Sequence, residues 1–279
     1  MNGDLNIPTC NEFNSMLGKP TINDFVALKG QRKIVCLTAY SAPMANVLDP
    51  HCDLLLVGDS VWMVVYGMDN TQSVDLNTMI RHGQAVMRRR KSALVVIDLP
   101  SGSYEISPEQ ALVSANEVIN KTGADAVKLE GGREVRESIE RILSAGIPVM
   151  GHLGLTPQSI YKFGTYTVRA KEDMEAEQLR KDAKMLDEIG CFSVVFEKIP
   201  AQLATEVSKS IHCPTIGIGA GSGCDGQVLV LPDMLGITQE FSPRFLRRYL
   251  NMGEQMNSAI QQYVKDVRSR DFPNADEQY

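Results

Sequence analysis

The sequence lacks the features that would direct it to a bilayer, a disulfide framework or nucleic acid. None of its apolar runs approaches the length of about 20 residues that crosses a membrane. Its six cysteines form no C-x-x-C pair, which argues against structural zinc and against a set of disulfides. A net charge of −6 disfavours nucleic acid and anionic membrane as main partners. No basic segment followed by an apolar stretch opens the chain, so we expect a reduced, cytoplasmic protein.

What the sequence does contain is an alternation of apolar runs and amphipathic segments. Eight runs rich in Val, Ile and Leu are typical of parallel strands buried on both faces. They are 33–40, 53–59, 92–99, 126–131, 147–154, 192–199, 213–221 and 227–235, the last having the weakest pattern. Segments of helical length lie between them, at 75–90, 107–122, 133–145, 172–189 and 200–210.

This order of strand and then helix predicts one (β/α)8 TIM barrel, because no Pro/Gly/Ser-rich linker divides the 279 residues. A doubly wound open sheet is the alternative. We expect a single barrel domain over 1–279, with a peripheral segment at about 1–20 and C-terminal helices and a tail at about 241–279. Within the latter, 241–268 is predicted to form one or two helices.

Polar side chains interrupt five of the runs at the end where a barrel carries its active site. In "AVKLEGG" (126–132), Lys128 and Glu130 are two apart and therefore share one face of the strand, which a barrel turns to its interior. Similar residues close four other runs, so the strands together predict one polar site at the mouth of the barrel. The complete set is Asp59, Asp98, Lys128, Glu130, His152 and Glu197.

Three acids of this set suit a hard divalent cation. Asp59, Asp98 and Glu130 supply the oxygen ligands that Mg²⁺ prefers, and the cation would allow three carboxylates to stay ionised side by side. For any one of these acids, a salt bridge or a helix cap is the alternative interpretation. For His152, a catalytic role and a structural role remain open.

Several long segments resemble those of the ketopantoate hydroxymethyltransferase family, also called 3-methyl-2-oxobutanoate hydroxymethyltransferase. The resemblance runs from about residue 20 to 270, with its motifs in order. These segments are "LLLVGDS" (54–60), "VVIDLPSGSY" (95–104), "SPEQAL" (107–112), "GADAVKLEGG" (123–132), "AGIPVMGHLGLTPQS" (145–159) and "CPTIGIGAGSGCDGQVLVLPDMLG" (213–236).

The resemblance implies a barrel of the phosphoenolpyruvate/pyruvate type, assembled as a homodecamer. It implies transfer of a hydroxymethyl group from 5,10-methylenetetrahydrofolate to 3-methyl-2-oxobutanoate through an enolate, giving ketopantoate at the start of pantothenate synthesis. Mg²⁺ would be the cofactor, and the partners would be a keto acid and a folate.

The resemblance also implies roles for individual residues. The implied Mg²⁺ ligands are Asp59, Asp98 and Glu130, two of them direct and one through water or at longer range. The implied contacts to the keto acid are Asp59, Ser60, Asp98 and Lys128. The implied catalytic residues are Glu197 as the base, Lys128 beside the substrate oxygens and His152 lining the same site.

The sequence departs from the family pattern at a few positions, which leaves two other functions open. Trp62 stands where the family has a small residue, and Ser101 stands where it has phenylalanine. A loop proline is missing from "TQSV" (71–74), and a "GGY"-like turn is "GTY" (164–166). One alternative is another Mg²⁺-dependent keto-acid enzyme of the same superfamily, although its K-x-C-G-H lid motif is absent. The other is a degenerate, non-catalytic paralogue.

Overall fold

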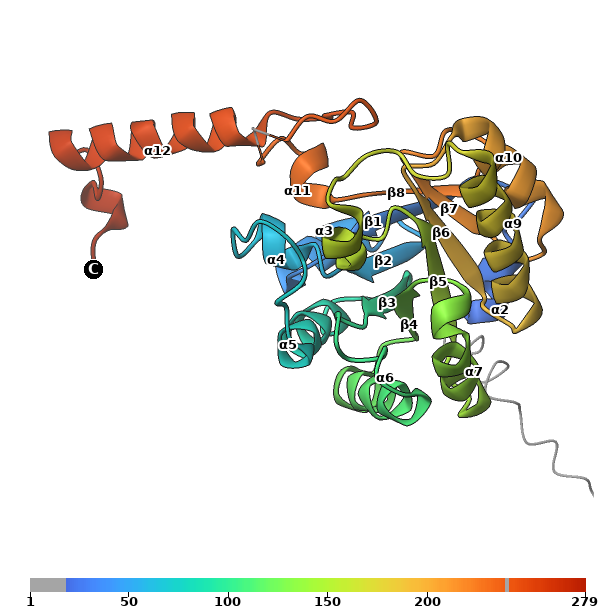
Figure 1. Cartoon of the computed structure of the whole chain (residues 1–279). Coiled ribbons are helices and arrows are strands. Elements are labelled where there is room, and N and C mark those ends of the chain that lie inside the picture. The colour runs from blue at the N-terminus through green and yellow to red at the C-terminus, as the bar shows by residue number, and fades with distance from the viewer. Residues whose placement is uncertain (1–18, 239–240) are drawn as a thin grey trace, which may run out of the picture. The chain divides into compact units, whose positions relative to one another are not determined.

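The computed structural model describes residues 19–238 and 241–279, which fall into two units divided after Leu229. In the first unit, eight strands are each parallel to their neighbours and β8 pairs with β1, so the sheet closes into a barrel (Figure 1). The predicted (β/α)8 barrel is confirmed. The strands are β1 (Ile34–Thr38), β2 (Leu54–Val57), β3 (Leu94–Asp98), β4 (Ala126–Glu130), β5 (Val149–Gly154), β6 (Ser193–Glu197), β7 (Thr215–Ile218) and β8 (Gly226–Leu229).

Helices follow the strands, and the longer ones lie close to the predicted segments. The Ser107 hydroxyl caps α6 by accepting the Gln110 N–H, Pro108 occupies the first turn, and Gly123 ends the helix at a φ of 72°. The helices of this unit are α2 (Ile22–Val26), α3 (Ala42–Leu48), α4 (Val61–Val64), α5 (Leu76–Met87), α6 (Pro108–Thr122), η1 (Arg133–Val135), α7 (Arg136–Ser144), η2 (Pro157–Ser159), α8 (Ile160–Phe163), α9 (Asp173–Glu188) and α10 (Ala201–Ser210).

Helix α2 packs against the apolar interior at the N-terminal end of the barrel. Its Phe25 is 2% exposed and meets Phe192 edge-on, with ring centroids 5.7 Å apart. Phe25 belongs to a core cluster to which every strand of the barrel contributes. Its members include Leu94, Ala126 and Met150. The interior at the N-terminal end of the barrel is therefore apolar, which leaves the C-terminal end for polar side chains.

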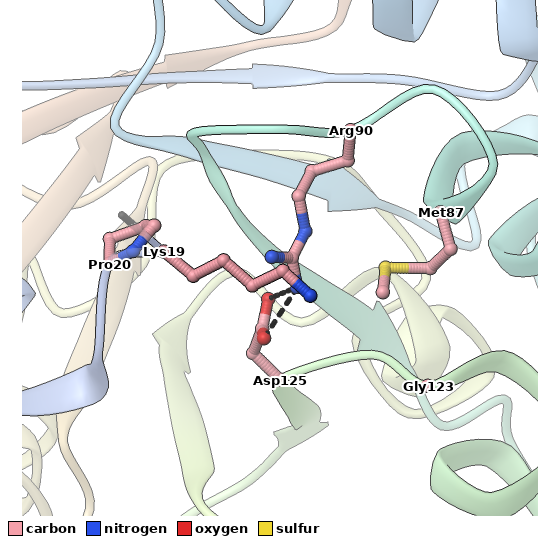
Figure 2. Close-up of a pocket in the computed structure, with 6 residues that line it drawn as sticks. All are labelled: Lys19, Pro20, Met87, Arg90, Gly123 and Asp125. Atoms are coloured by element: carbon pink, nitrogen blue, oxygen red, sulfur yellow. Dashed lines mark hydrogen bonds and ion pairs between the residues drawn. The ribbon is translucent and has the colours of Figure 1, made fainter. Parts of the chain in front are cut away.

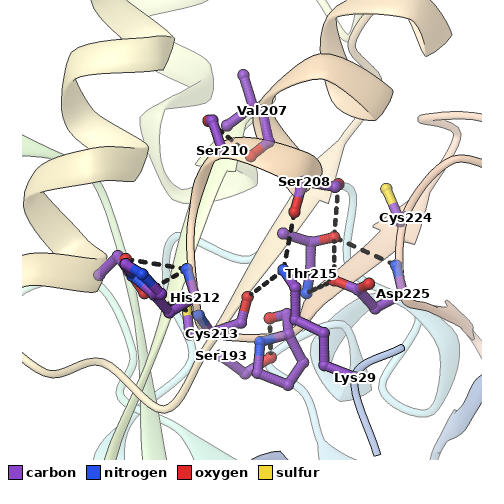
Figure 3. Close-up of polar contacts among 12 residues, drawn as sticks. Lys29, Ser193, Val207, Ser208, Ser210, His212, Cys213, Thr215, Cys224 and Asp225 are labelled. Atoms are coloured by element: carbon purple, nitrogen blue, oxygen red, sulfur yellow. Dashed lines mark hydrogen bonds and ion pairs between the residues drawn. The ribbon is translucent and has the colours of Figure 1, made fainter. Parts of the chain in front are cut away.

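A polar network ties the segment after α2 to β7 (Figure 3). The Lys29 ammonium donates to the carbonyl oxygens of Ser208 and Cys213 at 2.8 and 2.9 Å, and it pairs with Asp225 at 3.1 Å. Asp225 in turn accepts the backbone N–H of Thr215 at 2.8 Å. These contacts stabilise the N-terminal end of the barrel, which in this fold serves stability rather than catalysis.

The same end carries a cavity of about 280 Å³ near the starts of β3 and β4. Figure 2 shows the ion pair within it, in which Arg90 Nη2 lies 2.6 Å from the Asp125 carboxylate. Asp125 also accepts the Val95 N–H at 2.8 Å. Because the predicted polar residues lie at the opposite ends of the strands, this cavity is separate from them. Its lining residues are Lys19, Pro20, Met87, Arg90, Gly123 and Asp125.

The second unit, from Val230 onward, contains α11 (Leu231–Met234), α12 (Met252–Ser269) and η3 (Ala275–Glu277). The eighth strand and a helix within 241–268 are confirmed, but the bounds of both differ from the prediction. The expected strand over 227–235 ends at Leu229 and gives way to a helix, because Pro232 suits a first helical turn and cannot donate to a strand. Residues 241–251 contain no helix, and Pro243 restricts the backbone there.

The described cysteines are all buried and carry free thiols, namely Cys36, Cys52, Cys191, Cys213 and Cys224. Each is packed as a small apolar side chain, and burial raises the pKa of Cys52 to about 11. Cys10 and most of the predicted segment 1–20 lie outside the described residues. In the part of the chain that is described, no helix has the length and apolar character that spanning a membrane requires.

Candidate active site

The strand register brings the predicted polar residues together at the C-terminal end of the barrel. Asp98 of β3 pairs with Lys128 of β4, and Glu130 of β4 pairs with His152 of β5. Ala126, two residues before Lys128, belongs to the core cluster, so the inner face of β4 changes from apolar to charged along its length. The charges of "AVKLEGG" therefore form a polar layer above the apolar core.

Lys128 and Asp98 form a buried ion pair. Lys128 Nζ lies 3.1 Å from Asp98 Oδ1, and the two side chains are 4% and 3% exposed. The other oxygen, Oδ2, accepts the backbone N–H of Asp59 at 3.0 Å. Asp98 Oδ1 has no partner with hydrogen-bond geometry, so the pair leaves acceptor capacity on this oxygen.

His152 lies between two acids from neighbouring strands. Its Nδ1 is 3.2 Å from Glu130 Oε1, and its Nε2 is 3.5 Å from Glu197 Oε2. Burial and Lys128 would lower the pKa of His152, but the two acids raise it to about 9. The two acids therefore favour the protonated imidazole, while Lys128 Nζ, 3.3 Å from Nδ1, opposes it. The ring lies between the end of β4 and the end of β6.

Two residues to which the sequence assigned no role complete this cluster. Gln158 Nε2 donates to Asp59 Oδ2 at 2.9 Å, and the Gln158 backbone N–H donates to Glu130 Oε2 at 2.9 Å. The Tyr104 hydroxyl donates to Gln158 Oε1 at 2.5 Å. Both residues lie inside segments quoted for the family resemblance, "VVIDLPSGSY" and "GLTPQS", and this was the only signal in the sequence.

The electrostatics of the site show an excess of negative charge. Burial, with Asp98 and Glu130 nearby, raises the pKa of Asp59 to about 8. Burial also raises the pKa of Asp98 although Lys128 opposes it. Burial alone would raise the pKa of Glu130, but His152 and Lys128 hold it below its ordinary value. Asp59 is thus the acid whose charge is least compensated.

A charge count tests whether a divalent cation fits. If all four carboxylates were ionised, they would exceed the two cations, Lys128 and His152, by two negative charges, which one divalent cation would balance. The raised pKa of Asp59 agrees with this count, because its charge is unfavourable without such a cation. The carboxylates are Asp59, Asp98, Glu130 and Glu197. Within the described residues, no three His, Cys, Asp or Glu side chains are grouped so that they could hold a metal by themselves. Mg²⁺ commonly binds through only one or two carboxylates and completes its shell with water and substrate oxygens, so a pair such as Asp59 and Asp98 has the donor chemistry that it requires.

The first turn of α4 adds a hydroxyl beside Asp59. Ser60 Oγ lies 2.9 Å from the Tyr40 hydroxyl. Trp62 Nε1 donates to Ser73 Oγ at 2.8 Å, and its ring packs against Tyr66 at a tilt of 39°, with centroids 4.8 Å apart. Trp62, which departs from the family pattern, is thus held in place by a hydrogen bond and a ring contact.

Backbone crowding surrounds Glu197 at the end of β6. Gly154 adopts a φ of 96°, and a Cβ atom there would lie 2.3 Å from the Glu197 carbonyl oxygen. The next residue, Lys198, adopts a φ of 46°, which is uncommon for a residue with a side chain. Strained backbone of this kind is found at functional sites, where the surrounding contacts hold it in place.

A closed parallel barrel with buried acids at the C-terminal ends of its strands belongs to the class of (β/α)8 enzymes. Solved structures share this fold. A putative phosphonomutase from Burkholderia cenocepacia matches with a TM-score of 0.62 at 15% identity, over 79% of this chain and 96% of its own. A phosphonopyruvate hydrolase matches with a TM-score of 0.59 at 11% identity, over 92% and 90%. These likenesses show the barrel fold.

The sequence places the chain in one family within this class. The model of ketopantoate hydroxymethyltransferase matches residues 19–275. A 3-methyl-2-oxobutanoate hydroxymethyltransferase of Flavobacterium johnsoniae is 58% identical over 93% of this chain and 96% of its own length. Another, of Christiangramia forsetii, is 57% identical over the same shares. The chain belongs to the ketopantoate hydroxymethyltransferase family, and it is a transferase that forms ketopantoate on the route to pantothenate.

Proposed function

We propose that this chain forms ketopantoate through an enolate of 3-methyl-2-oxobutanoate, with Mg²⁺ as cofactor and 5,10-methylenetetrahydrofolate as the one-carbon donor. The observation that carries the proposal is the meeting of four carboxylates and two cations at the end of the barrel. Such a site suits a small anion that binds together with a divalent cation. The same residues would be hard to explain as a purely structural cluster, because buried charges are costly.

Asp59 and Asp98 would hold the cation directly, with Glu130 acting through water or at longer range. The raised pKa of Asp59 supports this assignment, because it indicates a carboxylate without a positive partner. Asp98 Oδ1, although it lies 3.1 Å from Lys128 Nζ, keeps acceptor capacity for a cation. Bound there, Mg²⁺ supplies a Lewis acid that draws electron density from the keto and carboxylate oxygens of the substrate. Ser60, next to Asp59, would contact the keto acid.

Lys128 would contribute positive charge beside the same substrate oxygens. Burial would lower the pKa of Lys128, but three acids hold it above its ordinary value, so the ammonium is charged throughout the physiological range. Negative charge develops on these oxygens as the proton leaves the substrate. A fixed cation in a dry site stabilises that charge without reorganising solvent.

Glu197 would be the base that removes the C3 proton of the keto acid. Its side chain is 17% exposed, whereas those of Asp98 and Glu130 are 3% exposed, so it has more access to a ligand than either of these acids. His152 would hold its carboxylate in place. The resulting enolate carbon would then attack the methylene carbon of the folate, forming the C–C bond as one C–N bond breaks. Water would replace the remaining C–N bond with a C–O bond, releasing tetrahydrofolate and ketopantoate.

Proton exchange in D₂O tests this assignment without the folate. The wild-type chain with 3-methyl-2-oxobutanoate and Mg²⁺ should exchange the C3 proton, which NMR follows directly. Glu197→Gln should slow the exchange by about 10²- to 10⁴-fold, the usual contribution of a general base. Glu206→Gln is the matched control, because Glu206 is an exposed acid that pairs with Arg180 at 2.8 Å on the outer helices.

Three results would contradict the proposal: no exchange in the wild type, exchange that is insensitive to EDTA, or a Glu197→Gln variant as active as the control. Addition of methylenetetrahydrofolate and detection of ketopantoate then tests the second half of the reaction. On the family resemblance we also propose a homodecamer located in the cytoplasm, built from a single barrel domain with peripheral C-terminal helices. Light scattering of the purified chain measures its oligomeric state.

A further inference from the structure

Gln158 lies outside the strands but contacts the ends of three of them. It sits in η2 and is 8% exposed. Its Nε2 donates to Asp59 Oδ2 at 2.9 Å and to the carbonyl oxygen of Leu99 at 3.0 Å. Its backbone N–H donates to Glu130 Oε2 at 2.9 Å. One residue therefore joins the segments that follow β2 and β3 to the last residue of β4.

The neighbours at both ends determine which way the Gln158 amide points. The Leu99 carbonyl oxygen, 3.0 Å from Gln158 Nε2, can only accept, so the amide end beside it must be NH₂. At the other end, the Tyr104 hydroxyl donates to Gln158 Oε1 at 2.5 Å, with the Glu130 carbonyl oxygen as a second acceptor at 3.2 Å. The NH₂ group is thereby the end that faces Asp59. The same Tyr104 oxygen accepts the backbone N–H of Glu130 at 3.3 Å. Tyr104 therefore links the side chain of Gln158 to the backbone of Glu130.

A neutral donor suits this position better than a charged one. Asp59 lies near Asp98 and Glu130. Repulsion between the like charges would turn the Asp59 carboxylate away from these two acids. An amide N–H holds Asp59 Oδ2 through a hydrogen bond but adds no positive charge. A lysine or arginine there would hold the oxygen as well, but it would also compensate the negative charge that a cation needs. The second oxygen of Asp59, Oδ1, is not engaged by the amide.

We propose that Gln158 and Tyr104 form a positioning pair that orients Asp59 and Glu130 toward the cation and the keto acid. Neither residue would touch the reacting atoms. The inference rests on the proposed function, because the two acids need orientation only if they share a cation. It predicts that removing either residue weakens metal binding while the fold is retained.

The test measures binding of Mn²⁺ to the full chain by EPR, alongside kcat and KM for the keto acid. Gln158→Met removes the amide but keeps the length of the side chain, and Tyr104→Phe removes one oxygen atom. Each should weaken Mn²⁺ binding by about 10- to 100-fold, the usual effect of losing a partner that orients a metal ligand. The double variant should lose less than the sum of the two single losses, since the Tyr104–Gln158 hydrogen bond couples the pair, although Tyr104 also contacts the Glu130 backbone directly.

Ser138→Ala is the matched control. The Ser138 hydroxyl is buried and donates to the backbone carbonyl oxygen of Tyr104 at 2.9 Å, so its loss perturbs the same segment without touching the amide. It should lower the melting temperature but leave the Mn²⁺ dissociation constant within about twofold of the wild type, because no group that contacts an acid is removed.

The outcomes separate the two proposals. A wild-type chain that binds no Mn²⁺ would overturn the metal site of the proposed function and this inference with it. Wild-type binding together with unchanged binding in both single variants would overturn the inference alone. Losses that add in the double variant would also overturn it, because the residues would then act independently. If Gln158→Met does not fold, Tyr104→Phe and its control decide the question.

Discussion

Replacing Lys128 with methionine should test the electrostatics of the site most directly. The change removes the ammonium and keeps an unbranched side chain. Lys128 Nζ lies 3.1 Å from Asp98 Oδ1 in a pair that is at most 4% exposed. Removing one member of a buried pair leaves the other charge uncompensated, which costs about 3–5 kcal/mol of unfolding free energy. At about 2–4 °C per kcal/mol for a domain of this size, the melting temperature should fall by roughly 6–20 °C.

The loss should depend on pH in a defined direction. Burial already raises the pKa of Asp59 and Asp98, and Lys128 opposes both shifts. Without Lys128 both pKa values rise further above the ordinary value of 3.8. A carboxyl group with a raised pKa in the folded state destabilises the protein above its unfolded pKa, and the cost grows as pH rises toward the folded pKa. The deficit should therefore be larger at pH 8 than at pH 5.

Urea denaturation followed by circular dichroism, in EDTA at both pH values, measures this deficit. Lys121→Met is the control, because Lys121 is 51% exposed and pairs with Glu117 on the surface of α6. Such exposed pairs contribute about 0–1 kcal/mol, so this variant should differ little from the wild type. The reasoning is refuted if Lys128→Met is as stable as the wild type at pH 8, or if its deficit is greater at pH 5.

Two further substitutions test the scaffold around the site. Gly154→Ala should cost roughly 2–4 kcal/mol of unfolding free energy and slow proton exchange, because its Cβ would meet the Glu197 carbonyl oxygen at 2.3 Å. Gly146 has a φ of 82°, and a Cβ added there would have no atom within 4 Å, so Gly146→Ala should cost only about 1–2 kcal/mol. Equal losses of unfolding free energy for the two variants in urea denaturation would argue against crowding at Gly154. Burial would raise the pKa of Asp49, but the N–H groups of residues 91–93 hold it below 3.8, so its contribution to stability is present above pH 3.8 and is lost at lower pH. Asp49→Asn should therefore cost about 1.5–3 kcal/mol of unfolding free energy at pH 7. In urea denaturation the difference between the variant and the wild type should narrow below pH 4, and a constant difference would contradict this reasoning.

The barrel and its polar mouth could be predicted because both leave local marks in the sequence. Strands buried on both faces appear as continuous apolar runs, and the charges of Lys128 and Glu130 stand out within such a run. The last strand, predicted at 227–235, is present but ends at Leu229, because a short apolar run fits the start of a helix as well as a strand. There Pro232 was the local signal that the strand had ended.

The sequence by itself determined the order of strands and helices, the family and the acids at the strand ends, because these depend on residues that are near one another in the chain. Only the tertiary structure decided the partners of those acids. The register sets Asp98 beside Lys128 and Glu130 beside His152, and a shift of one residue would turn each side chain to the other face of the sheet. Gln158 reaches Asp59 across 99 positions of the chain, a contact that no local pattern predicts and that closure of the barrel creates.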